Sequence, residues 1–372
     1  MSPNLPADFI NWLKNKKEND YWYLNNSSNT YALEKYSEII EKLKNQDLPC
    51  RYITWFVNNI CNLSCDHCGV SANDLSYDNL SIIDFANIIP ELIKLGTEYV
   101  TLSGGEPFLR KDIIEIIELL HYSDFKVGIV TNGSKISKYS KKLLKHCPDS
   151  VTVSIDGLRK NHDKIRGKKG SFEKALDSLE IFREVGVKLI NVHTCIYPEN
   201  LDELDELREI FFNKKIDQWV LRPVFLSGRA DGKNQYSLSD NQVKNLLIYA
   251  KNSVELGYDV SIGGDLGYLE KLDSILSSKP YFDTTGWSGM VILPNGDIKA
   301  FNESYLPIEG NILKDNIKDI WYDKFTSYRF QEIPQECISC EYHGRCRCGY
   351  YPALELGKRC IRPILRELEN EI

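Results

Sequence analysis

The chain has 372 residues, enough for one large domain or two smaller ones, and its 42% hydrophobic content can build a full core. Its net charge of −7 gives no electrostatic case for binding nucleic acid or an anionic membrane. No apolar run approaches the roughly 18 residues of a transmembrane helix, and no basic stretch precedes an apolar one at the N-terminus, so we expect a cytoplasmic protein without a secretory signal.

Residues 1–50 are polar, with a weak helical stripe at 31–43, and predict a short N-terminal appendage. From residue 51 to about 223, short apolar segments predict strands at Tyr52–Val57, Tyr99–Ser103, Lys126–Thr131, Ser150–Ile155, Leu189–Ile196 and Gln218–Arg222. Amphipathic segments between them predict helices at Ser81–Leu95, Asp112–His121 and Ser171–Val185. Six βα units in a row predict a parallel sheet, open or curled into a full or partial barrel, with its chemistry at the C-terminal strand ends.

The pattern changes after a further predicted helix at residues 239–256. Trp287–Leu293, a turn at Pro294–Asp297 and Ile298–Phe301 predict a hairpin, and a helix is expected near Ile317–Tyr328. A group of cysteines follows. We therefore place a domain boundary near residue 265 and expect three parts, an appendage over 1–50, a core over 51–265 and a cysteine-rich domain over 266–372.

The eleven cysteines need an explanation other than disulfides, which are rare in the cytoplasm. Eight of them are grouped, three at positions 61–68 and five at 337–360, and grouped cysteines in a reducing compartment point to metal. We interpret the scattered Cys50, Cys147 and Cys195 as small core residues.

The first group, Cys61-Asn-Leu-Ser-Cys65-Asp-His-Cys68, directly follows the first expected strand with C-x3-C-x2-C spacing. Three thiolates can hold three irons of a cubane and leave the fourth iron open to a small molecule. The alternative is a zinc site with His67 as the fourth ligand, although its place between two ligands makes His67 a poor one.

Three further motifs lie at the ends of the next three expected strands. Ser103-Gly104-Gly105-Glu106-Pro107 has two glycines, which let the backbone approach a ligand closely and expose polar groups to an ammonium, although a simple turn would also use them. Thr131-Asn132-Gly133 is equally compatible with an ordinary turn and with a ligand contact. Ser154-Ile155-Asp156-Gly157 ends the fourth strand, and Arg166 comes shortly after it.

Together these motifs resemble the radical S-adenosylmethionine (SAM) superfamily, from about Ile53 to Arg222 and more weakly to the C-terminus. The resemblance implies an α/β fold, a partial (β/α)6 TIM-like barrel, in which Cys61, Cys65 and Cys68 hold a 4Fe–4S cluster. It further implies that the open iron chelates SAM and that an electron from the cluster cleaves SAM to a 5′-deoxyadenosyl radical, which takes hydrogen from the substrate.

The resemblance also implies where SAM is held. His67 stands where the family usually has an aromatic residue near adenine, and Gly104–Glu106 would meet the amino group. Ser154 would bond the ribose or the carboxylate. Arg166 would pair with the methionine carboxylate, which its planar guanidinium fits, and the alternative for Arg166 is a solvated loop charge.

Three other polar residues on the expected strands have two interpretations each. Asn191 and His193 lie two positions apart and should share one face of their strand, which is either in the core or reaches adenine. Arg222, at the end of the sixth strand, is equally compatible with a salt bridge and with a substrate contact.

The second cysteine group can form a closed site with four or more thiolates, either structural zinc or an auxiliary iron–sulfur cluster. Its members are Cys337, Cys340, Cys346, Cys348 and Cys360. The C-x2-C-x5-C run and the preceding Gly-Asp hairpin resemble the SPASM/twitch C-terminal extension of radical SAM enzymes.

That second resemblance is incomplete. Tyr350 and Phe301 stand where the full SPASM form has cysteines, so the resemblance implies one auxiliary 4Fe–4S cluster in place of two. Cys348 does not fit the pattern, and it is either a cysteine that binds no metal or a ligand in place of one of the others. The ligands that remain on the pattern are Cys337, Cys340, Cys346 and Cys360.

The SPASM-like tail favours a maturase that modifies a peptide or protein side chain by thioether formation, crosslinking, epimerisation or oxidation. Modification of a tetrapyrrole side chain is the alternative. Anaerobic sulfatase maturation is less favoured, because Phe301 and Asn302 stand where those enzymes carry an acidic base. A non-catalytic iron–sulfur or zinc protein would have no use for the Gly104–Glu106 and Ser154–Arg166 motifs. The implied electron donor is of the flavodoxin or ferredoxin type.

Overall fold

The computed structural model describes residues 45–74, 78–277, 286–302, 306–329, 335–337, 340, 346 and 360–368. The helical stripe expected at 31–43 lies outside these residues, and so do Cys348 and Tyr350. Within the described part, no helix has the length and the apolar composition that crossing a membrane requires.

One sheet of ten strands organises the described residues, in the order β10-β9-β8-β1-β2-β3-β4-β5-β6-β7. Successive parallel pairs join β1 (Tyr52–Asn58), β2 (Tyr99–Gly104), β3 (Lys126–Thr131), β4 (Ser150–Ser154), β5 (Leu189–Ile196), β6 (Gln218–Pro223) and β7 (Val260–Ile262). The first six agree with the predicted strands to within one residue at each end, and β7 is an addition. Because β7 and β10 are its edges, the described sheet does not close, as in a partial barrel.

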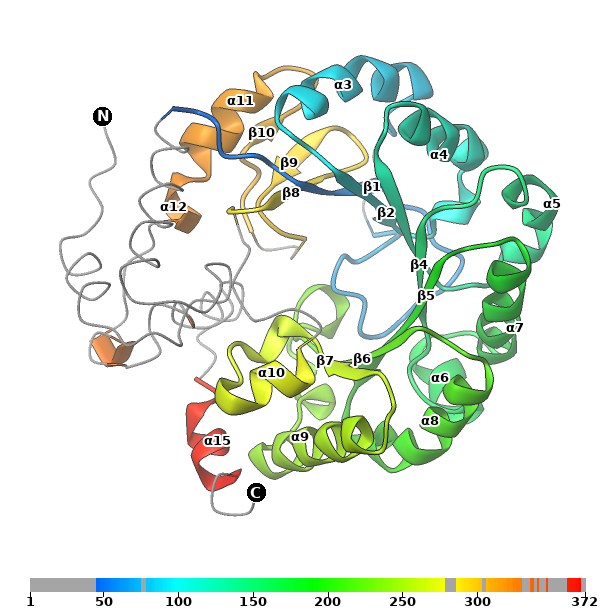
Figure 1. The fold of residues 1–372 in the computed structure, drawn as a ribbon, viewed down its shortest axis with the longest axis vertical. Helices are drawn as coiled ribbons and strands as arrows, with labels where there is room; N and C mark the ends of the chain where they lie inside the picture. Colours follow the sequence, from blue (N-terminus) through cyan, green and yellow to red (C-terminus); the bar gives the residue numbers. More distant parts are fainter. Residues whose placement is uncertain are drawn as a thin grey trace.

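Helices connect the strands and cover the outer side of the curved sheet (Figure 1). The connecting helices are α3 (Ile82–Lys94), α4 (Ile113–Tyr122), α5 (Ser140–Leu143), α6 (Arg159–Ile165), α7 (Ser171–Glu184), α8 (Leu204–Asn213), α9 (Asp240–Glu255) and α10 (Asp273–Leu276). The predicted helices α3, α4, α7 and α9 are confirmed. Helix α8, which buries Leu204, Leu207 and Phe211 at helical spacing, is missed by the sequence analysis.

Capping residues fix where two of these helices begin. The Ser81 hydroxyl accepts a hydrogen bond from the Asp84 N–H, and the Asp84 carboxylate accepts one from the Ser81 N–H at 2.7 Å. Ser239 and Gln242 form the same capping box at the start of α9. Each box satisfies two N–H groups that the first turn of a helix would otherwise leave unpaired.

The two faces of β5 show how the barrel separates its core from its interior. Ile190, Val192 and Ile196 are buried in the core that the outer helices share. Asn191, His193 and Cys195 alternate with them and lie half-buried on the opposite, inner face. Asn191 and His193 therefore share a face as predicted, and it is the inner face of the barrel.

The predicted C-terminal hairpin extends the same sheet as the barrel. Its strands are β8 (Gly289–Ile292) and β9 (Asp297–Lys299), and β10 (Gly310–Asn311) pairs antiparallel with β9. β8 pairs parallel with β1, so the hairpin lies directly beside the strand that leads into the first cysteine group. The domain boundary near residue 265 stays a prediction.

The helix predicted near 317–328 is a composite. It consists of α11 (Ile317–Asp319), a π-helical turn at Ile320–Lys324 and α12 (Thr326–Arg329). The last described helix, α15 (Arg362–Leu368), contacts α9 on the outside of the barrel. Short 3-10 turns complete the described structure at Pro107–Leu109, Ile136–Lys138, Pro198–Glu203, Gly228–Ala230, Asn234–Tyr236, Gly264–Leu266, Glu270–Leu272 and Gln335–Cys337.

Candidate active site

The first cysteine group forms a loop at the C-terminal end of β1. Cys65 is buried, and Cys61 and Cys68 are half-buried. Burial first, and then the nearby thiols of Cys68 and Cys61, raise the pKa of the Cys65 thiol to about 11. Thiols held together in this way ionise when a metal binds them, because metal coordination displaces the proton.

The hydrogen-bond partner of His67 bears on the zinc interpretation of the cysteine loop. His67, the fourth ligand of the zinc alternative, is hydrogen-bonded to Asp156 instead.

The glycine pair after β2 sets the backbone that leads into the cysteine loop. A Cβ atom on Gly104 would overlap the carbonyl oxygen of Asn58, and one on Gly105 would overlap that of Ile60. The Gly105 N–H donates to the Asn58 carbonyl at 3.0 Å, and the Glu106 N–H donates to the Ile60 carbonyl at 2.8 Å. The close approach that the sequence indicated is therefore made to the chain's own backbone, just before Cys61.

Glu106 links the ends of β2 and β3 with a carboxylate that is completely buried. Its oxygens accept hydrogen bonds from the Thr131 hydroxyl at 2.7 Å, the Asn132 N–H at 2.8 Å and the Phe108 N–H at 3.1 Å. Burial raises the pKa of the carboxyl, and these donors act in the opposite direction. The side chain of Glu106 thus serves the fold, and its predicted meeting with the SAM amino group stays a prediction.

Asn132 connects this edge of the sheet to the cysteine loop. Its side-chain amide nitrogen lies 3.8 Å from the Cys61 sulfur and donates to the Asn62 side-chain oxygen at 3.3 Å. The Thr131-Asn132-Gly133 turn, for which the sequence left two interpretations, therefore contacts the first cysteine of the loop.

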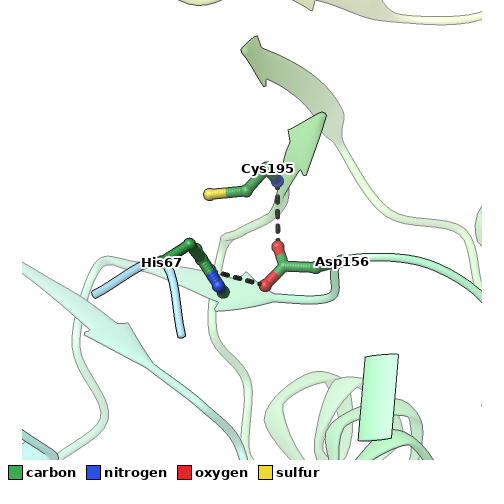
Figure 2. Close-up of side chains that lie close together, drawn as sticks. All are labelled: His67, Asp156 and Cys195. Atoms are coloured by element: carbon green, nitrogen blue, oxygen red, sulfur yellow. Dashed lines mark hydrogen bonds and ion pairs between the residues drawn. The ribbon is translucent and has the colours of Figure 1, made fainter. Parts of the chain in front are cut away.

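Asp156, after β4, is the centre of a buried network (Figure 2). One carboxylate oxygen accepts from the Arg166 Nε at 2.6 Å and from the His67 Nε2 at 3.0 Å. The other accepts from the Cys195 N–H at 2.9 Å. Burial alone would raise the pKa of this carboxyl, but Arg166 and then His67 hold it well below its usual range. The sequence motif contained Asp156, yet nothing in it indicated this role.

The three side chains in Figure 2 lie close together, as the ligands of a single metal ion would, but they do not form a metal site. Ligand atoms of His67, Asp156 and Cys195 all lie within 4.8 Å of one another. Both oxygens of the carboxylate, however, already accept hydrogen bonds, and one of the donors is the guanidinium of Arg166. A metal cation here would have to displace that positive charge, so the arrangement is a hydrogen-bond network.

Arg166 lies between Asp156 and the cysteine loop. It follows α6, is buried, and places its Nη1 at 3.9 Å from the Cys65 sulfur. Its backbone carbonyl accepts a hydrogen bond from the Ser64 N–H at 3.3 Å, which ties the end of α6 to the loop. Ser154, at the end of β4, is half-buried. The structure thus brings Arg166 and His67 to the cysteine loop, and their contacts with SAM stay predictions.

Arg222 lies at the end of β6, where it forms a two-point ion pair with Asp265. The distances are 2.8 Å from Nε and 2.6 Å from Nη2 to the two carboxylate oxygens. The salt-bridge interpretation is therefore present in the structure. On the neighbouring strand, burial and then Arg222 lower the pKa of His193 to about 3, so the imidazole is neutral at neutral pH.

The segment after β6 holds the cysteine loop from its other side, and the sequence analysis missed it. The Arg229 Nε donates to the Cys65 carbonyl at 2.9 Å, and the Arg229 N–H donates to the Cys68 carbonyl at 3.0 Å. The Tyr236 hydroxyl donates to the Asp66 carboxylate at 3.0 Å. No local spacing signals these contacts, because they join residues more than 150 positions apart in the chain.

Replacing Arg229 by alanine is expected to loosen the cysteine loop. The change removes a charged donor from a loop carbonyl, which typically costs about 1.5–3 kcal/mol of unfolding free energy. We expect faster loss of iron to a chelator under anaerobic conditions. The control is Arg159→Ala, because the Arg159 side chain is 69% exposed and forms an ion pair with Glu173. This change should alter neither the free energy of unfolding nor the rate of iron loss measurably. Equal effects of both changes would contradict the role of Arg229.

The four described cysteines of the second group also come together. Burial, and then Cys360, Cys340 and Cys337, raise the pKa of the Cys346 thiol to about 12. Arg362 places its Nη1 at 3.5 Å from the Cys340 sulfur.

Comparisons with known proteins agree with this geometry. The family model of the radical SAM superfamily matches residues 55–211. The chain is 30% identical over 292 residues to the sporulation killing factor maturation protein SkfB of Bacillus subtilis, covering 78% of this chain and 68% of SkfB. It is 28% identical over 340 residues to an AdoMet-dependent heme synthase of Methanosarcina barkeri, covering 84% of this chain and 96% of that protein.

Among solved structures, Streptococcus suis SuiB bound to its precursor peptide SuiA has the same fold. The TM-score is 0.71 at 20% identity, and the match covers 90% of this chain and 80% of SuiB. The partial-barrel prediction is confirmed by this likeness. From the family model, the match to SkfB and the cysteine loop at the end of β1, we conclude that the chain belongs to the radical SAM superfamily and is an enzyme that uses SAM and a 4Fe–4S cluster.

Proposed function

We propose that this enzyme modifies a side chain of a peptide or protein substrate in the cytoplasm. The observation that carries the proposal is the match to SkfB, a maturation protein, which spans 78% of this chain and so extends beyond the barrel region. The likeness in fold to SuiB, which was solved with a precursor peptide, supports it.

The residues of this chain seat and orient the cofactors in the proposed reaction. Cys61, Cys65 and Cys68 hold the cluster, and Asp156 holds Arg166 beside it, where the guanidinium can receive the methionine carboxylate. A cluster held there would supply the electron for reductive cleavage of SAM, and the bound pair would supply the radical chemistry that removes hydrogen from the substrate. A flavodoxin- or ferredoxin-type protein would deliver that electron.

The second cysteine group is proposed to hold one auxiliary 4Fe–4S cluster. The thiols of Cys337, Cys340 and Cys360 lie around that of the half-buried Cys346, and the four together match the four ligands of a closed cubane. A closed cluster has no open iron for a substrate. Its roles in this proposal are electron transfer and support of the cysteine-rich tail.

Tetrapyrrole modification is the second candidate, and one observation favours it. The match to the AdoMet-dependent heme synthase covers 96% of that protein, so the two chains correspond over nearly their whole lengths. Its identity is 28%, against 30% for SkfB, and the fold likeness to SuiB adds to the peptide side, so tetrapyrrole modification ranks second.

The experiment offers both substrate classes to the same enzyme preparation. Anaerobically reconstituted, reduced enzyme receives SAM with either candidate short precursor peptides, sought among the products of neighbouring genes, or an iron porphyrin bearing propionate side chains. We expect 5′-deoxyadenosine formation to rise with the peptide, and the peptide to change in mass spectrometry. Crosslinking or oxidation lowers its mass by the hydrogens removed, whereas epimerisation shows as deuterium uptake in D2O. Modification of the porphyrin alone would refute the peptide proposal.

A further inference from the structure

We propose that Arg362 and Glu270 set the reduction potential of the auxiliary cluster, Arg362 raising it and Glu270 lowering it. The inference rests on the proposed cluster at the second cysteine group. Neither residue is a cluster ligand in that proposal. Arg362 contacts two of the ligands, and Glu270 is paired with Arg362.

Arg362 makes two contacts with the sulfurs of the group. Its Nη1 lies 3.5 Å from the Cys340 sulfur, and its backbone N–H donates to the Cys360 sulfur at 3.5 Å. The guanidinium also lowers the pKa of the Cys360 thiol, although burial and the neighbouring thiols outweigh this effect. One residue thus directs both a charged donor and a backbone dipole at two of the four thiols.

Glu270 opposes that positive charge from the barrel side. The Arg362 Nε lies 3.0 Å from a Glu270 carboxylate oxygen, and the side chains are 21% and 8% exposed. Glu270 adopts a left-handed backbone conformation, with a φ of 54°, at the start of a 3-10 turn after β7. Such a conformation is costly for a residue with a side chain, and here the carboxylate meets Arg362.

The physical argument concerns the charge of the reduced cluster. Reduction adds one negative charge to the iron–sulfur core, and hydrogen bonds and positive charge at its sulfurs stabilise that state. The partly buried guanidinium is weakly screened by solvent, so it should favour reduction, and the Glu270 carboxylate should favour oxidation. Arg362 should therefore raise the reduction potential of the auxiliary cluster, and Glu270 should lower it.

The test measures potentials in the full-length enzyme with both clusters. Arg362→Gln removes the charge and keeps an amide donor, and Glu270→Gln removes the opposing charge at nearly the same volume. Potentials come from redox titration followed by electron paramagnetic resonance, and SAM addition identifies the first cluster because only its open iron binds SAM. Arg366→Gln, an exposed position on the same helix, is the matched control.

We expect Arg362→Gln to lower and Glu270→Gln to raise the auxiliary potential. Each shift should reach about 59 mV, a tenfold change for a one-electron couple, with the first cluster and the control unchanged. The tuning role would be refuted if the auxiliary potential did not change in either variant, or shifted in the same direction in both, while the protein held about eight irons per chain. The iron content would in that case still support the auxiliary cluster. The iron content of wild type is also compared with that of the quadruple variant Cys337→Ala/Cys340→Ala/Cys346→Ala/Cys360→Ala. If both proteins hold about four irons per chain, the proposed auxiliary cluster and its proposed tuning are both refuted. If Arg362→Gln does not fold, the shift of the auxiliary potential in Glu270→Gln is the test.

Discussion

The Cys65→Ala enzyme is expected to form no 5′-deoxyadenosine from SAM. Cys65 is the buried member of the cysteine loop, and Arg166 and Arg229 both contact it. Three thiolates are needed to hold three of the four irons, and Cys65→Ala leaves only two. Without a properly held cluster, SAM cleavage has no electron source. Chromatography of anaerobic, dithionite-reduced reaction mixtures measures the product directly.

Cys147→Ala is the matched control for this result. Cys147 is a half-buried cysteine outside both groups, and burial raises the pKa of its thiol as it does for Cys65. The control should keep its SAM cleavage. Full turnover by Cys65→Ala would contradict the ligand assignment, and equal losses in both proteins would show that the effect comes from stability.

The sequence predicted those parts of the site whose information is local. Strands β3 and β5 begin and end at the predicted residues, because apolar runs with turn residues after them specify buried strands. The cysteine loop follows β1 as expected, since ligand spacing is itself a local pattern. The hairpin was also predicted, but its pairing with β1 was not, because residues 289–292 contain no signal for which strand they join.

The interactions that hold the site together could not be read from the sequence. Asp156 contacts His67, Arg166 and Cys195, which come from three separate segments of the chain. Arg229 reaches back to the cysteine loop from beyond β6. The close approach of Gly104 to Asn58 and of Gly105 to Ile60 is visible only in the fold, and the contact of these glycines with SAM stays a prediction.

Asp156→Asn should lower the free energy of unfolding by about 3–5 kcal/mol, because it leaves a buried arginine without its counter-charge. Asp156 is fully buried, Arg166 is 8% exposed, and their closest atoms are 2.6 Å apart. Asparagine keeps the size and still offers an oxygen to the Cys195 N–H. Denaturant unfolding of the anaerobic protein measures the change, and Asp156→Asn/Arg166→Met should recover much of it because both charges are then absent.

The same variants test whether Arg166 receives the carboxylate of SAM. In Asp156→Asn the unpaired guanidinium gains a new partner when SAM binds, so saturating SAM should raise the melting temperature more than it does in wild type. In Asp156→Asn/Arg166→Met that extra gain should disappear, since no cation remains to meet the ligand. Equal SAM-induced shifts in all three proteins would show that Arg166 serves only the network around Asp156, and that another residue binds the methionine carboxylate.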